Sequence, residues 1–146
     1  MSFALVPCDQ NGNPAQVIPD VAEELVANCQ ATADLYRRIG FVPPWIGYVA
    51  VVDNRAVGGG AFVGPPKEGC VEIAYFTLDE WQGQGFAGQT AAALVAIARS
   101  HDPSIKLKAF TLMEENASVR ILRRLGFTLV GTARDADAGE VWEWQA

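Results

Sequence analysis

Apolar residues along the chain fall into short runs that alternate with longer segments of helical spacing. The short runs predict strands, because they are rich in β-branched and aromatic residues and are bounded by turn residues. These strands are expected at residues 3–8, 47–52, 56–63, 71–78, 105–111, 127–132 and 140–144. Apolar positions three or four residues apart predict helices at residues 20–38, 85–100 and 116–125.

Turn and cap residues mark the ends of several of these elements. Asp53 and Asn54 separate two predicted strands, which is the spacing of a hairpin, although no glycine occupies the turn. Gly126 follows the last helical segment and predicts its C-terminal cap. The first helix is expected either as one continuous element or as two helices broken near Asn28.

The order of the predicted elements defines the fold class. After the first strand come a helix, three antiparallel strands, a helix, a strand, a helix and two closing strands. This order predicts an α/β (α+β) fold with a mixed, mostly antiparallel central sheet of about six to seven strands and helices on both faces. No composition shift or internal repeat divides the chain, so residues 1–146 are expected to form a single domain.

Composition and charge exclude several classes of protein. Half of the residues are hydrophobic and the net charge is −6, which argues against nucleic-acid binding and is compatible with a cationic amine ligand. No run of about 18 apolar residues is present, and the start of the chain has no secretory pattern, so a cytoplasmic protein without a membrane segment is expected. The scattered Cys8, Cys29 and Cys70 indicate reduced thiols, and the lone His101 leaves no metal-ligand set.

The glycine-rich segment at residues 82–88, Gln-Gly-Gln-Gly-Phe-Ala-Gly, is the strongest candidate for chemistry. A glycine loop that opens a helix presents backbone N–H groups at the positive end of the helix dipole, where a phosphate or pyrophosphate binds. The plainer alternative is a helix-opening turn. A P-loop is excluded because Gln89 stands where that motif needs Lys. A dinucleotide-binding loop fits the context poorly, because the preceding strands are predicted to be antiparallel.

Gln82, Gly85 and Ala87 match the pattern Q/R-x-x-G-x-G/A, and residues 72–87 together resemble the fourth strand and pyrophosphate loop of the GNAT acetyltransferases. Residues 115–127, Glu-Asn-Ala-Ser-Val-Arg-Ile-Leu-Arg-Arg-Leu-Gly-Phe, resemble a second segment of that superfamily, in the branch that acetylates ribosomal proteins. The two segments occur in the family's order, with one helix and one strand between them. The resemblance covers roughly residues 47–132.

The resemblance implies an acetyl-CoA site between two splayed parallel strands, at residues 71–78 and 105–111. Backbone groups of Phe76 and Leu78 are expected to pair with the pantetheine arm, and Asn116 is expected either to contact that arm or only to cap its helix. The amides of the loop are expected to hold the pyrophosphate, and they belong to Gln82, Gly83, Gln84, Gly85, Ala87 and Gly88.

The resemblance also implies catalytic and acceptor residues. Glu72 matches the family's general base, which accepts a proton from the attacking amine. The general acid is unassigned, because the position where many relatives carry Tyr is Arg123, with Leu122 beside it. Tyr75 is interpreted as structural and Ser118 chiefly as a residue of the first helical turn. The acceptor pocket is expected to be lined by three aromatic residues, Tyr36, Trp45 and Trp81.

The predicted function is therefore transfer of an acetyl group from acetyl-CoA to a primary amine of a small molecule or peptide, by direct attack and without a metal. One alternative is an acyl-CoA-binding domain without catalysis, and another is a dinucleotide-binding domain. Trp142 and Trp144 alternate on the last strand and predict either one sheet face or a homodimer contact.

Overall fold

The computed structural model describes residues 2–146. Seven strands form a single sheet, with two long helices, one short helix and one 3-10 turn around it. The elements are β1 (Phe3–Pro7), α1 (Glu23–Ile39), β2 (Gly47–Val52), β3 (Arg55–Phe62), β4 (Cys70–Thr77), η1 (Asp79–Trp81), α2 (Phe86–His101), β5 (Lys106–Thr111), α3 (Ala117–Arg124), β6 (Thr128–Asp135) and β7 (Gly139–Gln145).

The strand order across the sheet is β1-β2-β3-β4-β5-β7-β6. Every neighbouring pair is antiparallel except β4 and β5, which are parallel because α2 carries the chain back across the sheet between them. The predicted mixed, mostly antiparallel sheet is therefore confirmed.

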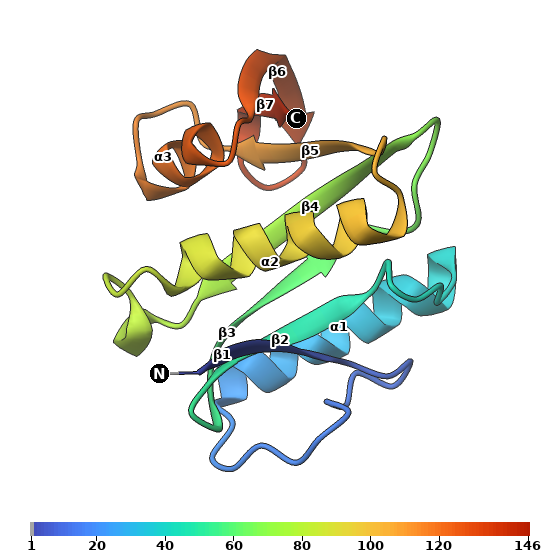
Figure 1. The fold of residues 1–146 in the computed structure, drawn as a ribbon, viewed down its shortest axis with the longest axis vertical. Coiled ribbons are helices and arrows are strands. Elements are labelled where there is room, and N and C mark those ends of the chain that lie inside the picture. Colours follow the sequence, from blue (N-terminus) through green and yellow to red (C-terminus); the bar gives the residue numbers. More distant parts are fainter. Residues whose placement is uncertain (1) are drawn as a thin grey trace.

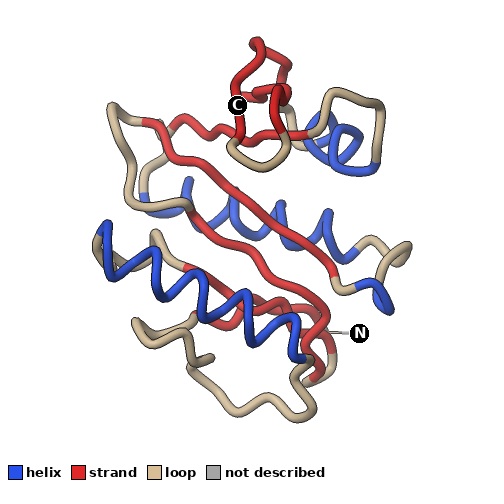
Figure 2. Tube along the Cα trace, turned by 180° about the vertical axis from the view of Figure 1, so that it is seen from behind, coloured by secondary structure: helices blue, strands red, loops and turns tan. Residues whose placement is uncertain are grey.

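The helices cover opposite faces of the sheet. Figures 1 and 2 show α2 on one face and α1 on the other. Leu94 of α2 and Leu122 of α3 share one buried apolar cluster with Trp144 of β7, whereas Leu25 of α1 packs into a different cluster with Val49 of β2. Both faces of the central strands are thus buried, which explains the apolar runs in the sequence.

The hairpin between β2 and β3 forms without glycine. Asp53 and Asn54 have φ angles of 48° and 66°, so both turn residues are left-handed, as a type I′ turn requires. Asp and Asn tolerate this region better than other residues with a side chain. The structure also resolves the two alternatives for the first helix, because α1 runs through Asn28 without a break.

Glycines in β3 allow two other elements to approach the strand closely. A Cβ on Gly58 would lie 2.2 Å from the carbonyl oxygen of Phe76 in β4. A Cβ on Gly60 would lie 2.9 Å from side-chain atoms of Thr90 and Leu94 in α2. The sequence of β3 therefore fixes where β4 and α2 lie.

The parallel pair β4–β5 is short. Its register covers only Cys70 with Lys106, Val71 with Leu107 and Glu72 with Lys108, although β4 continues to Thr77. Beyond this point the two strands diverge toward the end of the sheet near α3 (Figure 1). The expected splayed parallel strands are present.

None of the helices within residues 2–146 has the length and apolar character that crossing a bilayer requires. Over the same residues, His, Cys, Asp and Glu side chains form no group of three or more that could hold a metal ion.

Candidate active site

A cavity of about 500 Å³ lies where β4 ends and α2 begins, and we call it the loop cavity. Three elements form its walls: the end of β4, the glycine loop with the first turn of α2, and one face of α3. The wall residues that matter below are Tyr75, Thr77, Trp81, Gly85, Ser118 and Arg124. The segments that carry the two sequence motifs therefore meet around one space.

The backbone of the glycine loop has the geometry of a helix-opening turn whose N–H groups can bind an anion. Gly83 and Gly85 have φ angles of 80° and 85°, where a side chain would be strained. Gly85 is the N-cap of α2, and the first helical hydrogen bond runs from the N–H of Gln89 to its carbonyl, at 3.1 Å. The N–H groups of the first helical turn thus have no acceptor within the helix, and they lie at its positive end.

The two glutamines of the loop take different positions. The Gln82 side chain turns back and donates from Nε2 to the carbonyl of Thr77 at 3.2 Å and to Oδ1 of Asp79 at 3.3 Å, so it closes the turn. Gln84 is exposed and does not line the cavity. Arg124 of α3 supplies a cationic side chain to the cavity wall.

Two buried hydroxyl groups in the loop cavity lack partners. Tyr75 Oη and Thr77 Oγ1 are inaccessible to solvent and have no hydrogen-bond partner among the residues that the structure describes. Both side chains line the loop cavity and both come from β4, two residues apart on one strand face. A buried polar group without a partner destabilises the free protein, and the group beside the Tyr75 hydroxyl is the hydroxyl of Ser118 in α3.

The backbone of β4 corrects one expectation. The N–H of Leu78 donates to the carbonyl of Val57 at 2.8 Å, and its carbonyl accepts from the N–H of Trp81 at 2.8 Å. Both backbone groups are thus already bonded, and Leu78 does not line the cavity. Phe76 lines the cavity with its side chain, but its backbone belongs to the set that faces β3.

The backbone groups that face the gap belong to the alternate residues. The N–H of Val63 donates to the carbonyl of Glu72 at 2.9 Å, so residues 72, 74, 76 and 78 direct their backbone groups toward β3. Tyr75 and Thr77 direct theirs toward the space that β5 has left. Phe76 and Leu78, which the resemblance assigns to the pantetheine arm, thus direct their backbone groups toward β3, and Tyr75 and Thr77 direct theirs toward the gap.

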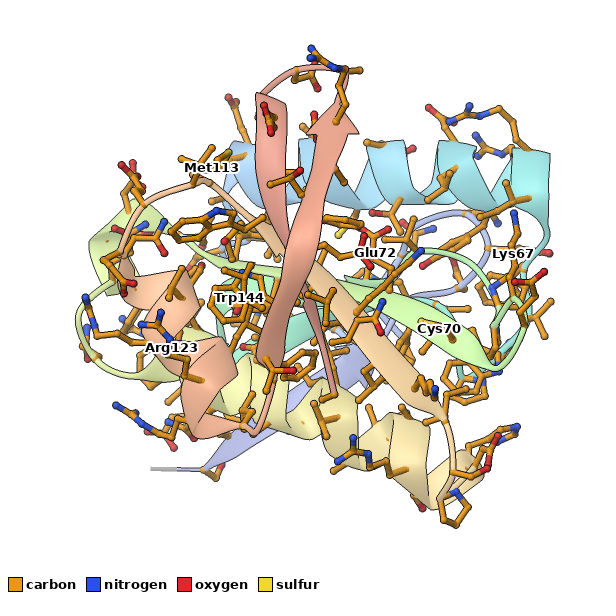
Figure 3. All side chains as sticks on the ribbon, turned by 90° about the horizontal axis from the view of Figure 1, so that it is seen from above. Lys67, Cys70, Glu72, Met113, Arg123 and Trp144 are labelled. Atoms are coloured by element: carbon orange, nitrogen blue, oxygen red, sulfur yellow. The ribbon has the colours of Figure 1, made fainter. Side chains whose placement is uncertain are left out.

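Glu72 lies at the last point where β4 and β5 are paired, and its side chain is half-buried (Figure 3). Burial raises the pKa of its carboxyl above the usual value of 4.5, and Lys108 opposes this effect without cancelling it. Asp135 and Glu143 raise the pKa further. A carboxylate with raised proton affinity is suited to accept a proton from an amine.

A second, smaller cavity of about 220 Å³ lies between α1 and the sheet, and we call it the α1 cavity. Asn28, Thr32 and Tyr36 form its α1 wall. Tyr75 and Phe76 line both cavities, so one segment of β4 separates them. Two compartments that meet at one strand can hold two reactants side by side.

The three aromatic residues expected in the acceptor pocket lie in three different places. Tyr36 lines the α1 cavity, and its hydroxyl donates to the carbonyl of Phe62 at 2.5 Å. Trp81 lines the loop cavity instead. Trp45 is only 5% exposed and packs edge-to-face on Phe62 in the core, with ring centres 5.1 Å apart, so the expectation for Trp45 is wrong.

Some residues at α3 make contacts within the protein, and others line the loop cavity. Asn116 caps the helix by accepting from the N–H of Val119 at 3.0 Å. Arg123 makes a bidentate ion pair with Glu115, at 2.7 and 2.9 Å, and lies over the ring of Trp144 (Figure 3). Arg123 is thus committed to the structure and does not line the loop cavity.

The closing strand uses its tryptophans in the sheet. Trp144 is buried, its Nε1 donates to Oγ1 of Thr111 at 2.9 Å, and its ring packs edge-to-face against Trp142. These contacts agree with the first of the two interpretations, a shared sheet face.

The fold and the two cavities together define an enzyme of the acyltransferase class, in which a phosphate-bearing donor enters between splayed strands. The sequence family described as acetyltransferase (GNAT) domain matches residues 13–128. The chain belongs to this family, and it is an N-acetyltransferase that uses acetyl-CoA. No curated protein sequence matches the chain.

Solved structures share the fold across the whole chain. RimL, a ribosomal L7/L12 alpha-N-protein acetyltransferase solved in complex with coenzyme A, has a TM-score of 0.70 at 22% identity, covering 100% of this chain and 94% of its own. The acetyl transferase of Salmonella typhimurium that modifies the N-terminal serine of L7/L12 has a TM-score of 0.69 at 19% identity, covering 100% and 95%. An IAA acetyltransferase from Bacillus cereus has a TM-score of 0.70 at 13% identity, covering 99% and 98%.

Proposed function

We propose that the protein transfers the acetyl group of acetyl-CoA, held in the loop cavity, to the primary amine of a small molecule or peptide held in the α1 cavity. The observation that carries this proposal is the shared wall of the two cavities at Tyr75 and Phe76. A thioester placed against this wall is within reach of an amine on its other side, so one direct transfer needs no covalent enzyme intermediate.

The chain's own residues fit acetyl-CoA. The backbone groups of Tyr75 and the N–H of Thr77 face the gap and can bond the amides of the pantetheine arm as an added strand would, whereas the carbonyl of Thr77 already accepts from Gln82. The free amides at the start of α2 suit the pyrophosphate, in the segment from Gly83 to Gly88. Arg124 is the cation nearest to this segment in the cavity wall, and it compensates for the neutral side chains of the loop.

The acceptor side supports a primary amine. Glu72 and Phe76 lie on the same face of β4, because residues two and four apart on a strand share a face. Phe76 lines the α1 cavity, so the carboxyl of Glu72 lies further along the face on which the amine would approach. In the proposed role, Glu72 accepts the proton that the ammonium must lose before its nitrogen attacks the thioester carbonyl.

The amine of a protein N-terminus is one acceptor to test, since the RimL structures carry that activity in their names. At 22% identity this likeness supports the shared fold, and the small amines remain equal candidates. The α1 cavity is about 220 Å³, which fits a single amine-bearing residue better than a folded surface.

The test has two stages. Calorimetric titration with acetyl-CoA is expected to show one binding site per chain, and titration with NAD is expected to show none. Thiol release is then measured with a panel of small amines and of peptides with free N-termini, with the N-acetylated peptides as controls. Binding without release for any amine would contradict the transfer, and absence of acetyl-CoA binding would contradict the donor site itself.

A further inference from the structure

The hydroxyl group of Tyr75 is one of two buried side-chain polar atoms within residues 2–146 that lack a hydrogen-bond partner. It is buried in the wall of the loop cavity, it has no hydrogen-bond partner among these residues, and the Ser118 hydroxyl of α3 lies beside it. The Ser118 hydroxyl can donate to Oη, and no acceptor among these residues holds the phenol proton. The proton is therefore available to an atom that becomes a strong acceptor only during the reaction, so the affinity for the unreacted ligand depends little on this hydroxyl.

The position of Tyr75 indicates which ligand atom this is. The residue lies three positions beyond Glu72, the last residue of β4 that pairs with β5, and so at the mouth of the gap between the strands. It also lines both cavities. If donor and acceptor occupy the two cavities, the thioester lies at this shared wall, and the sulfur atom is on the loop-cavity side.

The reaction requires a proton at this sulfur. When the amine nitrogen bonds to the thioester carbon and the C–S bond breaks, the sulfur leaves as a thiolate and becomes a thiol by gaining one proton. Arg123 is held by Glu115 and Trp144, and the apolar Leu122 is fully buried. Neither side chain lines the loop cavity, whereas Tyr75 and Ser118 both do.

We propose that Tyr75 is the general acid of this enzyme, and that its Oη–H protonates the sulfur of CoA as the C–S bond breaks. This inference rests on the proposed function. The ammonium loses two protons: one goes to Glu72 before the attack, and the second passes from the nitrogen to water as the amide forms. Tyr75 gives its proton to the sulfur and regains one from water at the open end of the cavity, so free CoA thiol, the acetylated amine and, from Glu72, one proton are released. Ser118 orients the phenol through the neighbouring hydroxyl.

The chemistry of a phenol suits this step. A tyrosine has an ordinary pKa of about 10 and a thiol one of about 8.5, so transfer of the phenol proton to the thiolate is uphill by about 1.5 pKa units and is completed as Tyr75 regains a proton from water. Burial raises the pKa of Tyr75, and the Ser118 hydroxyl opposes this effect, so the phenol keeps its proton at neutral pH. A protonated donor is thus present before the thiolate forms.

Tyr75→Phe tests the inference, because it removes the hydroxyl and keeps the ring that packs on the core. With acetyl-CoA we expect kcat to fall by about 100-fold or more, while the calorimetric Kd for acetyl-CoA changes by less than about threefold. With the acetyl thioester of 4-nitrothiophenol, whose thiolate leaves without protonation, wild type and variant are expected to have nearly equal kcat/KM. An equal loss with both donors would indicate a structural role and overturn the proposal.

Two variants serve as controls. Thr77→Val removes the other unpartnered hydroxyl of the same cavity, and we expect it to weaken acetyl-CoA binding with little change in kcat. Ser118→Ala is expected to lower kcat less than Tyr75→Phe does. If Ser118→Ala abolishes turnover while Tyr75→Phe retains it, the acid is Ser118 and the proposal is wrong. Absence of thiol release by the wild type would contradict the proposed function itself. Equal thiol release by the wild type and Tyr75→Phe would contradict only the role of Tyr75.

Discussion

At the scale of single residues, the balance of forces on Glu72 links its position to its proposed role. Its half-buried carboxyl loses hydration, which raises its pKa, and the cation Lys108 restores only part of the lost stability of the charged form. The ionised carboxylate of Glu72, which a base needs at neutral pH, therefore lowers the free energy of unfolding. Activity and stability are expected to change in opposite directions when this charge is removed.

Glu72→Gln tests that link. We expect kcat to fall by about 100-fold or more with the Kd for acetyl-CoA unchanged, because the carboxylate accepts the amine proton and is not part of the donor cavity. Stability is expected to rise at pH 7. A raised folded-state pKa means that stability is lost as pH rises through that pKa, so the difference in Tm between variant and wild type grows from pH 4 to pH 7.

Glu140→Gln is the matched control for Glu72→Gln, since Glu140 is exposed on β7 and lines neither cavity. It should leave both kcat and the pH dependence of Tm unchanged. An active Glu72→Gln variant would eliminate Glu72 as the base. A Tm difference that is the same at pH 4 and pH 7 would contradict the assigned cause of its raised pKa.

Arg124 of α3 brings a cationic side chain to the wall of the loop cavity. We expect Arg124→Ala to raise the KM for acetyl-CoA by roughly threefold to tenfold at low salt, because a charge-assisted hydrogen bond to phosphate is lost while the loop amides remain. The effect should shrink in 0.5 M salt, since an exposed cation is screened. Arg120→Ala, one turn away and outside the cavity wall, is the control, and equal effects of both variants would refute a specific contact.

The sequence predicted which segments form the candidate site better than it predicted which side chains line the cavities. The glycine loop was predicted from its own sequence because it is a local feature, and Gly83 and Gly85 do have positive φ angles. Glu72 was named from the family resemblance. Trp45 was placed wrongly, since nothing local distinguishes a core aromatic residue from a pocket residue. Tyr75 and Thr77 were overlooked as ligand contacts because their burial depends on α3, which is distant in sequence.

At the scale of elements, the expected and observed directions of the backbone groups in β4 differ by one residue. The strand itself was located correctly, but which edge of each residue bonds to β3 depends on the register, and a shift of one residue reverses every assignment. The register is fixed by contacts such as Leu78 with Val57 and Glu72 with Val63. Those contacts are non-local, so the pattern of apolar residues carries no information about them.

The phase of β4 can be measured by hydrogen exchange. On addition of acetyl-CoA, we expect the exchange rates of the Tyr75 and Thr77 amides to fall by at least about tenfold, because the ligand accepts a hydrogen bond from these amides or covers them. The amides of Phe76 and Leu78 should be protected with and without ligand, since they already bond to β3. The reverse pattern would restore the original assignment of Phe76 and Leu78.

At the scale of the whole molecule, the proposed donor site lies beside β4 and β5, the neighbouring strands with the fewest paired positions in the sheet, and we call the boundary between them the seam. The β1–β4 part with α1 and the β5–β7 part with α3 are joined by only three paired positions of β4 and β5, and by α2. The mixed, mostly antiparallel sheet was predictable from the order of the elements, and the parallel pair was predicted from the family resemblance. The opening of the seam followed from the family resemblance, because no local pattern states where two paired strands separate.

A ligand that fills this seam is expected to stabilise the entire chain against heat. Acetyl-CoA at 100 times its Kd adds about 2.7 kcal/mol to the free energy of unfolding, which for a chain of this length raises Tm by roughly 5–10 °C. NAD at the same concentration should leave Tm unchanged. Tyr75→Phe should keep nearly the full shift, because its hydroxyl acts on the departing sulfur, whereas Arg124→Ala should reduce it. A shift with NAD and none with acetyl-CoA would mean that the seam is not a donor site.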